Sequence, residues 1–346
     1  MRAMVIDHVT DMSRDPAPLK IVECPVPVPG EGEVLVKISA CGVCHTELDE
    51  IEGRAPPPVL PVIPGHQVVG RVEEKGKNAR RFKTGDRVGV AWIYSACGRC
   101  EYCSDGRENL CPDFMATGRD ANGGYAQYIK VSEEFACPIP DIFSDLEAAP
   151  LLCAGAVGYR ALKAAGIAEG RALGLTGFGA SGHIVLAMAK SLYPGLKIYV
   201  FARSAAEREF ARHLGAAWAG HAEDVPPEKM QAVIDTTPAW KPDVEALKNL
   251  APGGRLVINA IRKENHDREC LLNLDYARDI WMEKEIRSVA NVTRRDVTEC
   301  LELAARAGIK PEFQQYALEE ANLALQELTA KKIRGAKVLD LNRSIR

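Results

Sequence analysis

Residues 172–191 read ALGLTGFGASGHIVLAMAKS, and this stretch decides the fold class. Ala172–Thr176 has the length and apolar character of a buried strand, and Ile184–Ser191 is apolar at helical spacing. Between them lies the pattern Gly-x-Gly-x-x-Gly, which permits a tight turn, close approach of a pyrophosphate and close packing of helix on strand. The helix N-terminus would offer free N–H groups to the phosphates. The predicted cofactor-binding residues of this loop are Gly177, Phe178, Gly179, Ala180, Ser181 and Gly182.

The chain after this loop alternates between strand-like and helical segments. The strand-like segments are Lys197–Phe201, Gln231–Asp235 and Arg255–Ala260, and the helical ones are Ser204–Leu214 and Val244–Leu250. Such alternation predicts βαβ units and an α/β domain with a parallel sheet. Before residue 150 the apolar runs are short and separated by Gly and Pro, which predicts a β-rich domain. At the C-terminal end we expect helices at Asp296–Ala307 and Glu319–Lys331 and a strand at Ala336–Leu341.

The composition excludes several classes of protein. The 346 residues suggest two domains at about 150 residues each. Hydrophobic residues make up 47% and the net charge is −3, so neither a nucleic acid nor a membrane is an expected partner. No signal peptide is recognisable, which favours the cytoplasm. Eleven cysteines, an odd number, then argue against a disulfide framework and in favour of metal binding.

Four cysteines lie close together within residues 97–111: Cys97, Cys100, Cys103 and Cys111. Four thiolates suit tetrahedral zinc, and a closed set of this kind is typical of a structural site. An iron–sulfur cluster is the alternative, because C-x2-C-x2-C also occurs in ferredoxins. In ferredoxins, however, Cys-Pro follows the third cysteine after three residues, whereas Cys111-Pro112 follows Cys103 after seven. We therefore expect structural zinc.

The end of the second expected strand predicts which dinucleotide binds. An NAD site places Asp or Glu about 20 residues beyond the glycine motif, where it accepts a hydrogen bond from the ribose 2′-hydroxyl. Here that position reads Ala202-Arg203-Ser204, with no acid. A cation and a hydroxyl donor suit a 2′-phosphate, so Arg203 and Ser204 indicate a preference for NADP over NAD.

A second set of ligand-type residues is dispersed along the chain at Cys44, His66 and Cys153. Two thiolates and one imidazole form the Cys₂His set that catalytic zinc takes in alcohol dehydrogenases, with the fourth position left for substrate. The sequence predicts two zinc ions per chain.

These motifs together resemble the zinc-containing medium-chain alcohol dehydrogenases, and the yeast and bacterial branch most of all. The resemblance covers essentially the whole chain. It is carried by Gly42–Thr46, Gly65-His66, Thr84–Val88, the four-cysteine segment, Gly123–Ala126, Cys153 and the glycine loop. It implies a GroES-like β-rich catalytic domain into which a doubly wound Rossmann domain is inserted. We accordingly expect a catalytic domain at 1–153 with the zinc lobe at 97–111, a nucleotide-binding domain at 154–290, and a return to the catalytic domain at 291–346.

The resemblance also implies roles for individual residues. Cys44, His66 and Cys153 would hold catalytic zinc, and Thr46 would bond the substrate oxygen and pass its proton outward. Glu47, where most relatives carry Asp, would orient His66. His45 matches a position that contacts the cofactor pyrophosphate, and Trp92 matches an aromatic position of the substrate pocket.

Three positions depart from the family pattern. Gln67 stands where relatives usually carry Glu, Asp49 stands where liver-type relatives place the histidine that ends a proton relay, and Ala336 stands where many carry a pyrophosphate-binding arginine. Arg334 or Lys337 are the candidates to replace that arginine.

The resulting prediction is an enzyme that transfers hydride between a nicotinamide cofactor and an alcohol or carbonyl compound. Zinc, as a Lewis acid, would make the alcohol easier to deprotonate, and the deprotonated alcohol releases hydride readily. The partners would be a small-molecule alcohol, aldehyde or ketone and a second copy of the chain in a dimer or tetramer. The alternatives are a reductase of activated double bonds on the same scaffold and a non-catalytic protein that binds zinc and nucleotide.

Overall fold

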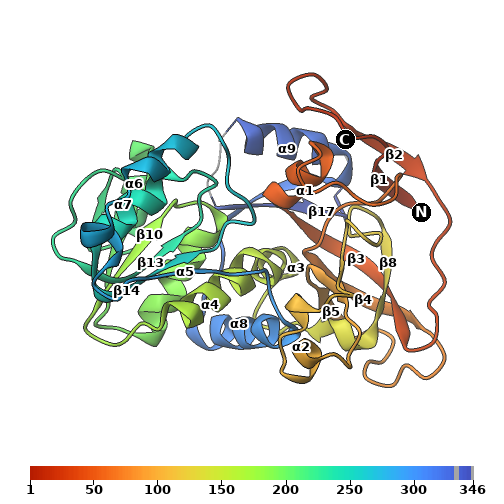
Figure 1. Ribbon diagram of the computed structural model, residues 1–346. Coiled ribbons are helices and arrows are strands. Elements are labelled where there is room, and N and C mark those ends of the chain that lie inside the picture. Colours follow the sequence, from red (N-terminus) through yellow and green to blue (C-terminus); the bar gives the residue numbers. More distant parts are fainter. Residues whose placement is uncertain (331–334, 344–346) are drawn as a thin grey trace. The chain divides into compact units, whose positions relative to one another are not determined.

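The chain divides into two compact units in the computed structural model, which describes residues 1–330 and 335–343. The first unit comprises Met1–Ala156 and Val292–Arg346, and the second comprises Val157–Asn291 (Figure 1). The sequence placed the corresponding borders after residue 153 and after residue 290. The second unit is thus inserted between two segments of the first.

The second unit is built on six parallel strands in the order β12-β11-β10-β13-β14-β15. The strands are β10 (Ala172–Thr176), β11 (Lys197–Phe201), β12 (Trp218–Gly220), β13 (Met230–Asp235), β14 (Leu250–Ile258) and β15 (Glu285–Ser288). The chain proceeds outward from β10 to one edge, then returns to β13 and proceeds to the other edge. This is the doubly wound Rossmann order, and its switch point lies between β10 and β13.

Helices α5 (Ala180–Leu192), α6 (Ala205–His213) and α7 (Lys241–Asn249) connect strands of this sheet, and α4 (Ala154–Ala165) precedes β10. All five residues of β10 are buried, as in a strand covered on both faces. Helix α5 begins at Ala180, within the glycine motif, and not at Ile184 as its apolar spacing suggested. The reason is that Gly179 is the N-cap, so the rest of the motif forms the first helical turn.

The first unit contains a seven-stranded sheet in the order β16-β17-β3-β4-β5-β9, with β8 also paired to β3. Its strands are β3 (Glu33–Val43), β4 (Val68–Lys75), β5 (Arg87–Val90), β8 (Tyr128–Ser132), β9 (Ala136–Pro138), β16 (Phe313–Ala317) and β17 (Ala336–Asp340). Two hairpins accompany it, β1 (Arg2–Ile6) with β2 (Leu19–Glu23) and β6 (Ile93–Ser95) with β7 (Met115–Ala116). Because β17 pairs antiparallel with β3, the C-terminal segment completes the N-terminal sheet.

The helices of the first unit are α1 (His45–Ile51), α2 (Glu101–Ser104), α3 (Asp145–Ala148), α8 (Arg294–Ala307) and α9 (Ala321–Thr329). The expected helix at residues 319–331 is α9, preceded by a 3₁₀ turn at Leu318–Glu320. Its predicted end at Lys331 lies outside the described residues. Among the helices of the described ranges, none has the length and apolar character that crossing a membrane requires. The expected combination of a β-rich domain and an inserted Rossmann domain is confirmed.

Candidate metal centres and nucleotide-binding loop

Three donor atoms from distant parts of the sequence converge in the first unit. Cys44 follows β3 and is the N-cap of α1, His66 precedes β4, and Cys153 precedes α4. Cys44 Sγ lies 3.5 Å from His66 Nε2, and His66 Nε2 lies 3.3 Å from Cys153 Sγ. The three atoms all lie within 4.8 Å of one another. Tetrahedral zinc, with bonds of about 2.0–2.3 Å, holds its ligands roughly 3.3–3.8 Å apart, so this set fits zinc.

Glu47 links two of these candidate ligands through one carboxylate. Its Oε1 lies 2.7 Å from His66 Nδ1, and both side chains are 0% exposed. Its Oε2 accepts a hydrogen bond of 2.8 Å from the backbone N–H of Cys44. That bond arises because Glu47 is the third residue of α1, where a carboxylate completes the capping box. A histidine held through Nδ1 can present Nε2 to a metal.

The pKa values of Cys44 and His66 are shifted because both side chains are buried beside other ionisable groups. Contact with the Cys153 thiol, followed by burial, raises the pKa of Cys44 well above its usual range. Burial lowers the pKa of His66, but attraction by Glu47 and Cys44 outweighs this effect and leaves the pKa well above its ordinary value. A divalent cation would neutralise the two thiolates, so the chemistry of the donor set also fits a metal.

The other residues predicted around this centre lie on the same elements. Thr46 is 7% exposed in the first turn of α1, and its N–H donates to Cys44 Sγ at 3.3 Å. His45, the first residue of α1, is exposed. Gln67 is buried against Gly42, where an added Cβ would lie 2.6 Å from the Gln67 carboxamide. The ring of Trp92 lies 4.9 Å from that of Phe114, a neighbour that sequence reasoning missed.

Two acidic residues of α1 differ in their surroundings. Asp49 accepts a hydrogen bond of 2.7 Å from Arg54 Nε and is therefore an ion-paired carboxylate. Glu50 is 0% exposed, and neither of its carboxyl oxygens has a hydrogen-bond partner among the described residues. Burial, with repulsion from Glu47, raises the pKa of Glu50 well above its usual range.

The four-cysteine segment also forms a compact donor set. The sulfur atoms of Cys97, Cys100, Cys103 and Cys111 all lie within 4.8 Å of one another, and the Sγ atoms of Cys97 and Cys103 are 3.9 Å apart. The backbone N–H of Cys97 donates to Cys111 Sγ, and the backbone N–H of Cys100 donates to Cys97 Sγ, each at 3.4 Å. Such N–H groups favour thiolates. Those of Arg99 and Cys100 lower the pKa of Cys97 to about 6.

The glycine loop joins β10 to α5 at the carboxyl edge of the parallel sheet. Gly177 has φ 79°, a left-handed conformation that suits glycine. A Cβ there would lie 2.6 Å from Thr236 Oγ1, and a Cβ on Gly182 would lie 2.7 Å from the carbonyl oxygen of Gly177. These close approaches explain why both positions are occupied by glycine. Among the predicted loop residues, Phe178 is buried and its ring packs edge-on against Phe210 at 5.6 Å.

The end of β11 carries the residues predicted to distinguish the cofactors. Ala202 is buried, whereas Arg203 and Ser204 are exposed. Ser204 is the N-cap of α6, and its Oγ accepts a 3.0 Å hydrogen bond from the N–H of Glu207. A second guanidinium lies at the same place, because Arg208 donates to the carbonyl oxygens of Ala202 at 2.8 Å and Arg203 at 2.7 Å. Arg208 was not singled out from the sequence. Its position four residues after Ser204 was a signal, because residues at this spacing lie one helical turn apart on the same face.

Lys337 does not suit the role of pyrophosphate ligand for which the sequence made it a candidate. Its side chain is 2% exposed, and Nζ donates to Gln314 Oε1 at 3.0 Å and to Tyr316 Oη and Glu327 Oε2 at 2.6 Å each. An ammonium group with three protein acceptors is not free for a phosphate. Arg334, the other candidate, lies outside the described residues.

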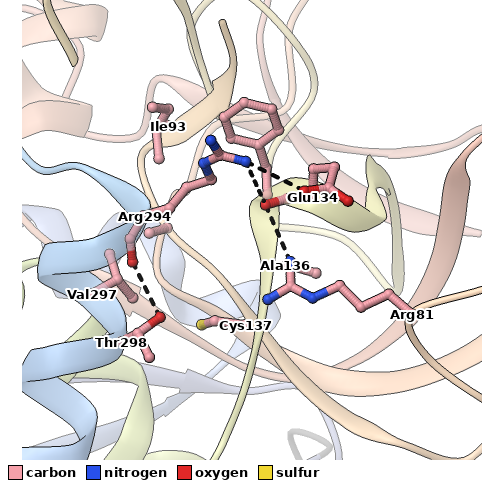
Figure 2. A pocket seen from close by; sticks show the side chains of 10 residues that line it. Arg81, Ile93, Glu134, Ala136, Cys137, Arg294, Val297 and Thr298 are labelled. Atoms are coloured by element: carbon pink, nitrogen blue, oxygen red, sulfur yellow. Dashed lines mark hydrogen bonds and ion pairs between the residues drawn. The ribbon is translucent and has the colours of Figure 1, made fainter. Parts of the chain in front are cut away.

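A separate small pocket in the first unit holds none of these residues (Figure 2). It lies beside β9 and the first turn of α8, where Arg294 donates to the carbonyl and carboxylate oxygens of Glu134 at 3.5 Å and 3.4 Å. Arg81 donates to the same carbonyl at 3.3 Å. Both guanidinium groups are therefore engaged in contacts within the protein.

Comparison with known proteins places the chain among alcohol dehydrogenases. Residues 30–141 match the alcohol dehydrogenase GroES-like domain. The chain is 42% identical over 330 residues to a probable alcohol dehydrogenase, AdhA, of Mycobacterium tuberculosis, covering 94% of this chain and 93% of that one. It is 38% identical to an alcohol dehydrogenase of Geobacillus stearothermophilus, covering 93% and 96%. The structure of CAD from Helicobacter pylori, solved with NADP(H), shares the fold with a TM-score of 0.87, 23% identity and 99% coverage of each chain.

The chain therefore belongs to the zinc-containing medium-chain alcohol dehydrogenase family. It is an enzyme, and the alcohol–carbonyl oxidoreduction with a nicotinamide cofactor predicted from its sequence is confirmed at the level of the family.

Proposed function

We propose that this enzyme is a zinc-dependent alcohol dehydrogenase or carbonyl reductase that prefers NADP to NAD and acts on a small-molecule alcohol, aldehyde or ketone. The observation that carries the proposal is the convergence of Cys44 Sγ, His66 Nε2 and Cys153 Sγ, with 3.5 Å and 3.3 Å between the imidazole nitrogen and the two sulfurs. Three ligands leave one tetrahedral position for a substrate oxygen, which is the arrangement of catalytic zinc sites.

Each residue around this centre has a separate task. Cys44, His66 and Cys153 would hold zinc, which as a Lewis acid favours loss of the proton from an alcohol or polarises a carbonyl. Glu47, 2.7 Å from His66 Nδ1, fixes the imidazole in the orientation that presents Nε2. Thr46 Oγ1 would accept the proton of the substrate hydroxyl and pass it outward. His45, at the exposed start of α1, would contact the cofactor pyrophosphate.

The cofactor would bind at Gly177–Gly182, with its adenosine ribose toward the end of β11. The preference for NADP is supported by Arg203 and Ser204, which are exposed, and by the absence of an acid in Ala202–Ser204. Arg208 adds a second positive charge at the same strand end. The negative charge of Glu207 opposes the preference for NADP. It does so only in part, because the Glu207 carboxylate is held in the capping box, where its Oε2 accepts from the N–H of Ser204 at 3.3 Å.

A second zinc would occupy Cys97, Cys100, Cys103 and Cys111, a closed set that serves stability and not turnover. Trp92, with Phe114, would form one wall of the substrate pocket. Two further expectations remain predictions, namely a homodimer or homotetramer and a location in the cytoplasm, where thiols stay reduced.

A substrate panel tests the proposal. The zinc-loaded enzyme would be assayed at 340 nm with primary and secondary alcohols, aldehydes, ketones and α,β-unsaturated carbonyl compounds, each with NADP and with NAD. We expect turnover of alcohols and carbonyls and a higher kcat/KM with NADP. Reduction of carbon–carbon double bonds alone would contradict the proposal and support the double-bond reductase.

A further inference from the structure

A buried ammonium group joins several loops at the carboxyl edge of the Rossmann sheet. The side chain of Lys263 is 9% exposed, and its Nζ lies 2.6 Å from Asp235 Oδ2 and 2.6 Å from Asp243 Oδ2. The same Nζ donates to the carbonyl oxygens of Thr237 at 3.1 Å and Ala239 at 2.9 Å. One side chain thus connects the loop after β14 with the loop after β13 and the first turn of α7.

The second oxygen of Asp235 extends this network to the glycine loop. Asp235 Oδ1 accepts a short hydrogen bond from Thr176 Oγ1 and one of 2.8 Å from Thr237 Oγ1. Thr176 is the last residue of β10 and immediately precedes Gly177. The carbonyl of Thr176 in turn accepts from the N–H of Thr236 at 3.0 Å and its Oγ1 at 2.9 Å. The start of the glycine loop is therefore held, through Asp235, by Lys263.

The network lies at the point of the sheet where doubly wound folds bind their ligands. Strands β10 and β13 are neighbours, and the chain leaves them toward opposite edges of the sheet, so their carboxyl ends form the topological switch point. Lys263 follows β14, the next strand outward. The ends of β13 and β14 are thus connected by one cation, and Asp235 extends this connection to Thr176 at the end of β10.

The charge of Lys263 is what allows this arrangement to persist. The side chains of Asp235 and Asp243 are 0% and 5% exposed, and both approach the same ammonium at 2.6 Å. Without the ammonium, two buried carboxyl groups would face each other and the two carbonyls of the β13–α7 loop would lose their donor. Removing one partner of a buried ion pair is costly, so the loops would rearrange to readmit water.

We propose that Lys263 is a positioning residue of the nucleotide site, which keeps Asp235 bonded to Thr176 and so holds the start of the glycine loop ready for the cofactor. The inference rests on the proposed binding of the cofactor at Gly177–Gly182. Lys263 acts through other residues and has no part in the chemical step, so its loss weakens cofactor binding and leaves the rate at saturation largely unchanged.

The test compares Lys263→Met with Lys229→Met in the full-length, zinc-loaded enzyme. Lys229 precedes the opposite, amino-terminal end of β13 and donates to the carbonyl of Lys248 at 2.6 Å, so it is a matched lysine outside the network. The measurements are the Kd of reduced cofactor by fluorescence titration, and KM and kcat, well below the thermal midpoint of each variant. We expect at least a tenfold higher Kd and KM for Lys263→Met, with kcat within threefold of wild type and Lys229→Met unchanged.

Thr176→Val is the second test variant. It removes the hydroxyl that donates to Asp235, at the other end of the network from Lys263, with little change in volume. It should raise the Kd severalfold, and the double variant Lys263→Met with Thr176→Val should bind no more weakly than Lys263→Met alone. Additive effects, or an unchanged Kd in a folded Lys263→Met, would overturn the inference. If Lys263→Met does not fold, an unchanged Kd in Thr176→Val overturns it. A wild-type enzyme that binds neither cofactor would refute the proposed function instead.

Discussion

Glu47 Oε1 lies 2.7 Å from His66 Nδ1 in an interior position where both side chains are 0% exposed, and the other oxygen of the same carboxylate holds the backbone N–H of Cys44 at 2.8 Å. A single residue thus fixes one candidate zinc ligand through its ring and another through its main chain. The first turn of α1 makes this possible, because a capping-box glutamate reaches back to the N-cap residue that precedes the helix. One carboxylate therefore serves both the helix cap, through Oε2, and the candidate metal site, through Oε1.

Glu47→Gln should loosen catalytic zinc while preserving the helix cap. Glutamine keeps the size of the side chain but removes the negative charge beside His66, and partners of this kind are worth about 10–100-fold in metal affinity. The measurement is competition for zinc with a chelator. Glu147→Gln is the matched control, because Glu147 completes the capping box of α3 with Ser144 and neither residue is among the proposed metal ligands. Equal zinc retention by the two variants would refute a role for Glu47 in the metal site.

Thr46→Val should slow turnover without weakening cofactor binding. Valine nearly keeps the volume but cannot bond the substrate oxygen, and by analogy with other transition-state donors the loss is about 2.7–4 kcal/mol, or 10²–10³ in kcat. Steady-state kinetics together with cofactor titration separate the two effects. Thr46→Ser, which retains the hydroxyl, should recover most of the rate. A valine variant within threefold of wild type would remove Thr46 from the proton path.

Arg203→Ala should reduce the preference for NADP. A charge-assisted hydrogen bond to the 2′-phosphate contributes about 1.5–3 kcal/mol, which corresponds to one to two decades in the NADP/NAD ratio of kcat/KM. The lower end is expected, because Arg203 is exposed and solvent screens its charge. Adding Ala202→Asp should reverse the preference by repelling the phosphate and accepting from the 2′-hydroxyl. Arg171→Ala, before the opposite end of β10, is the control, and a wild-type enzyme that prefers NAD would contradict the assignment.

Asp243 should make the stability of the protein fall as the pH rises. Burial, with repulsion from Asp235, raises its pKa to about 8 despite the nearby Lys263. Between about pH 4 and 8 the folded protein therefore keeps a proton that the unfolded chain releases, and the free energy of unfolding decreases by up to roughly 1.4 kcal/mol per pH unit. Thermal midpoints between pH 6 and 8 should be less pH-dependent in Asp243→Asn than in wild type, whereas exposed Asp224→Asn should change nothing. Parallel profiles for all three would refute this titration.

Much of the fold was predictable because its signals are local. The change from short runs separated by Gly and Pro to strand–loop–helix alternation is present in the sequence, and β10, β11 and β13 lie where the apolar runs predicted them. The start of α7 was not predictable in this way. It begins at Lys241, because Asp267 accepts hydrogen bonds from the N–H groups of Trp240 and Lys241, and that partner lies 26 residues beyond Lys241.

The candidate site likewise contains residues that the sequence could predict and contacts that it could not. Cys44, His66 and Cys153 could be singled out from the sequence because few residue types bind zinc and because the motifs around them resemble those of a known family. The burial of Lys337 among Gln314, Tyr316 and Glu327 and the network of Lys263 depend on side chains that only the folded chain brings together. Contacts of this kind leave no periodic pattern in a sequence. The sequence therefore could not predict that Lys337, a candidate phosphate ligand, is bonded within the protein, or that Lys263 is a candidate positioning residue.

The zinc content of the purified enzyme and of two cysteine variants tests the central claim most directly. The account predicts two zinc ions per chain in the wild type. Cys44→Ser should retain about one zinc and the fold but lose turnover, whereas Cys103→Ser should lose the other zinc and unfold at lower temperature, since a structural zinc contributes directly to folding. A single zinc in the intact wild-type enzyme, or a Cys44→Ser variant that keeps both ions and turns over normally, would contradict the account.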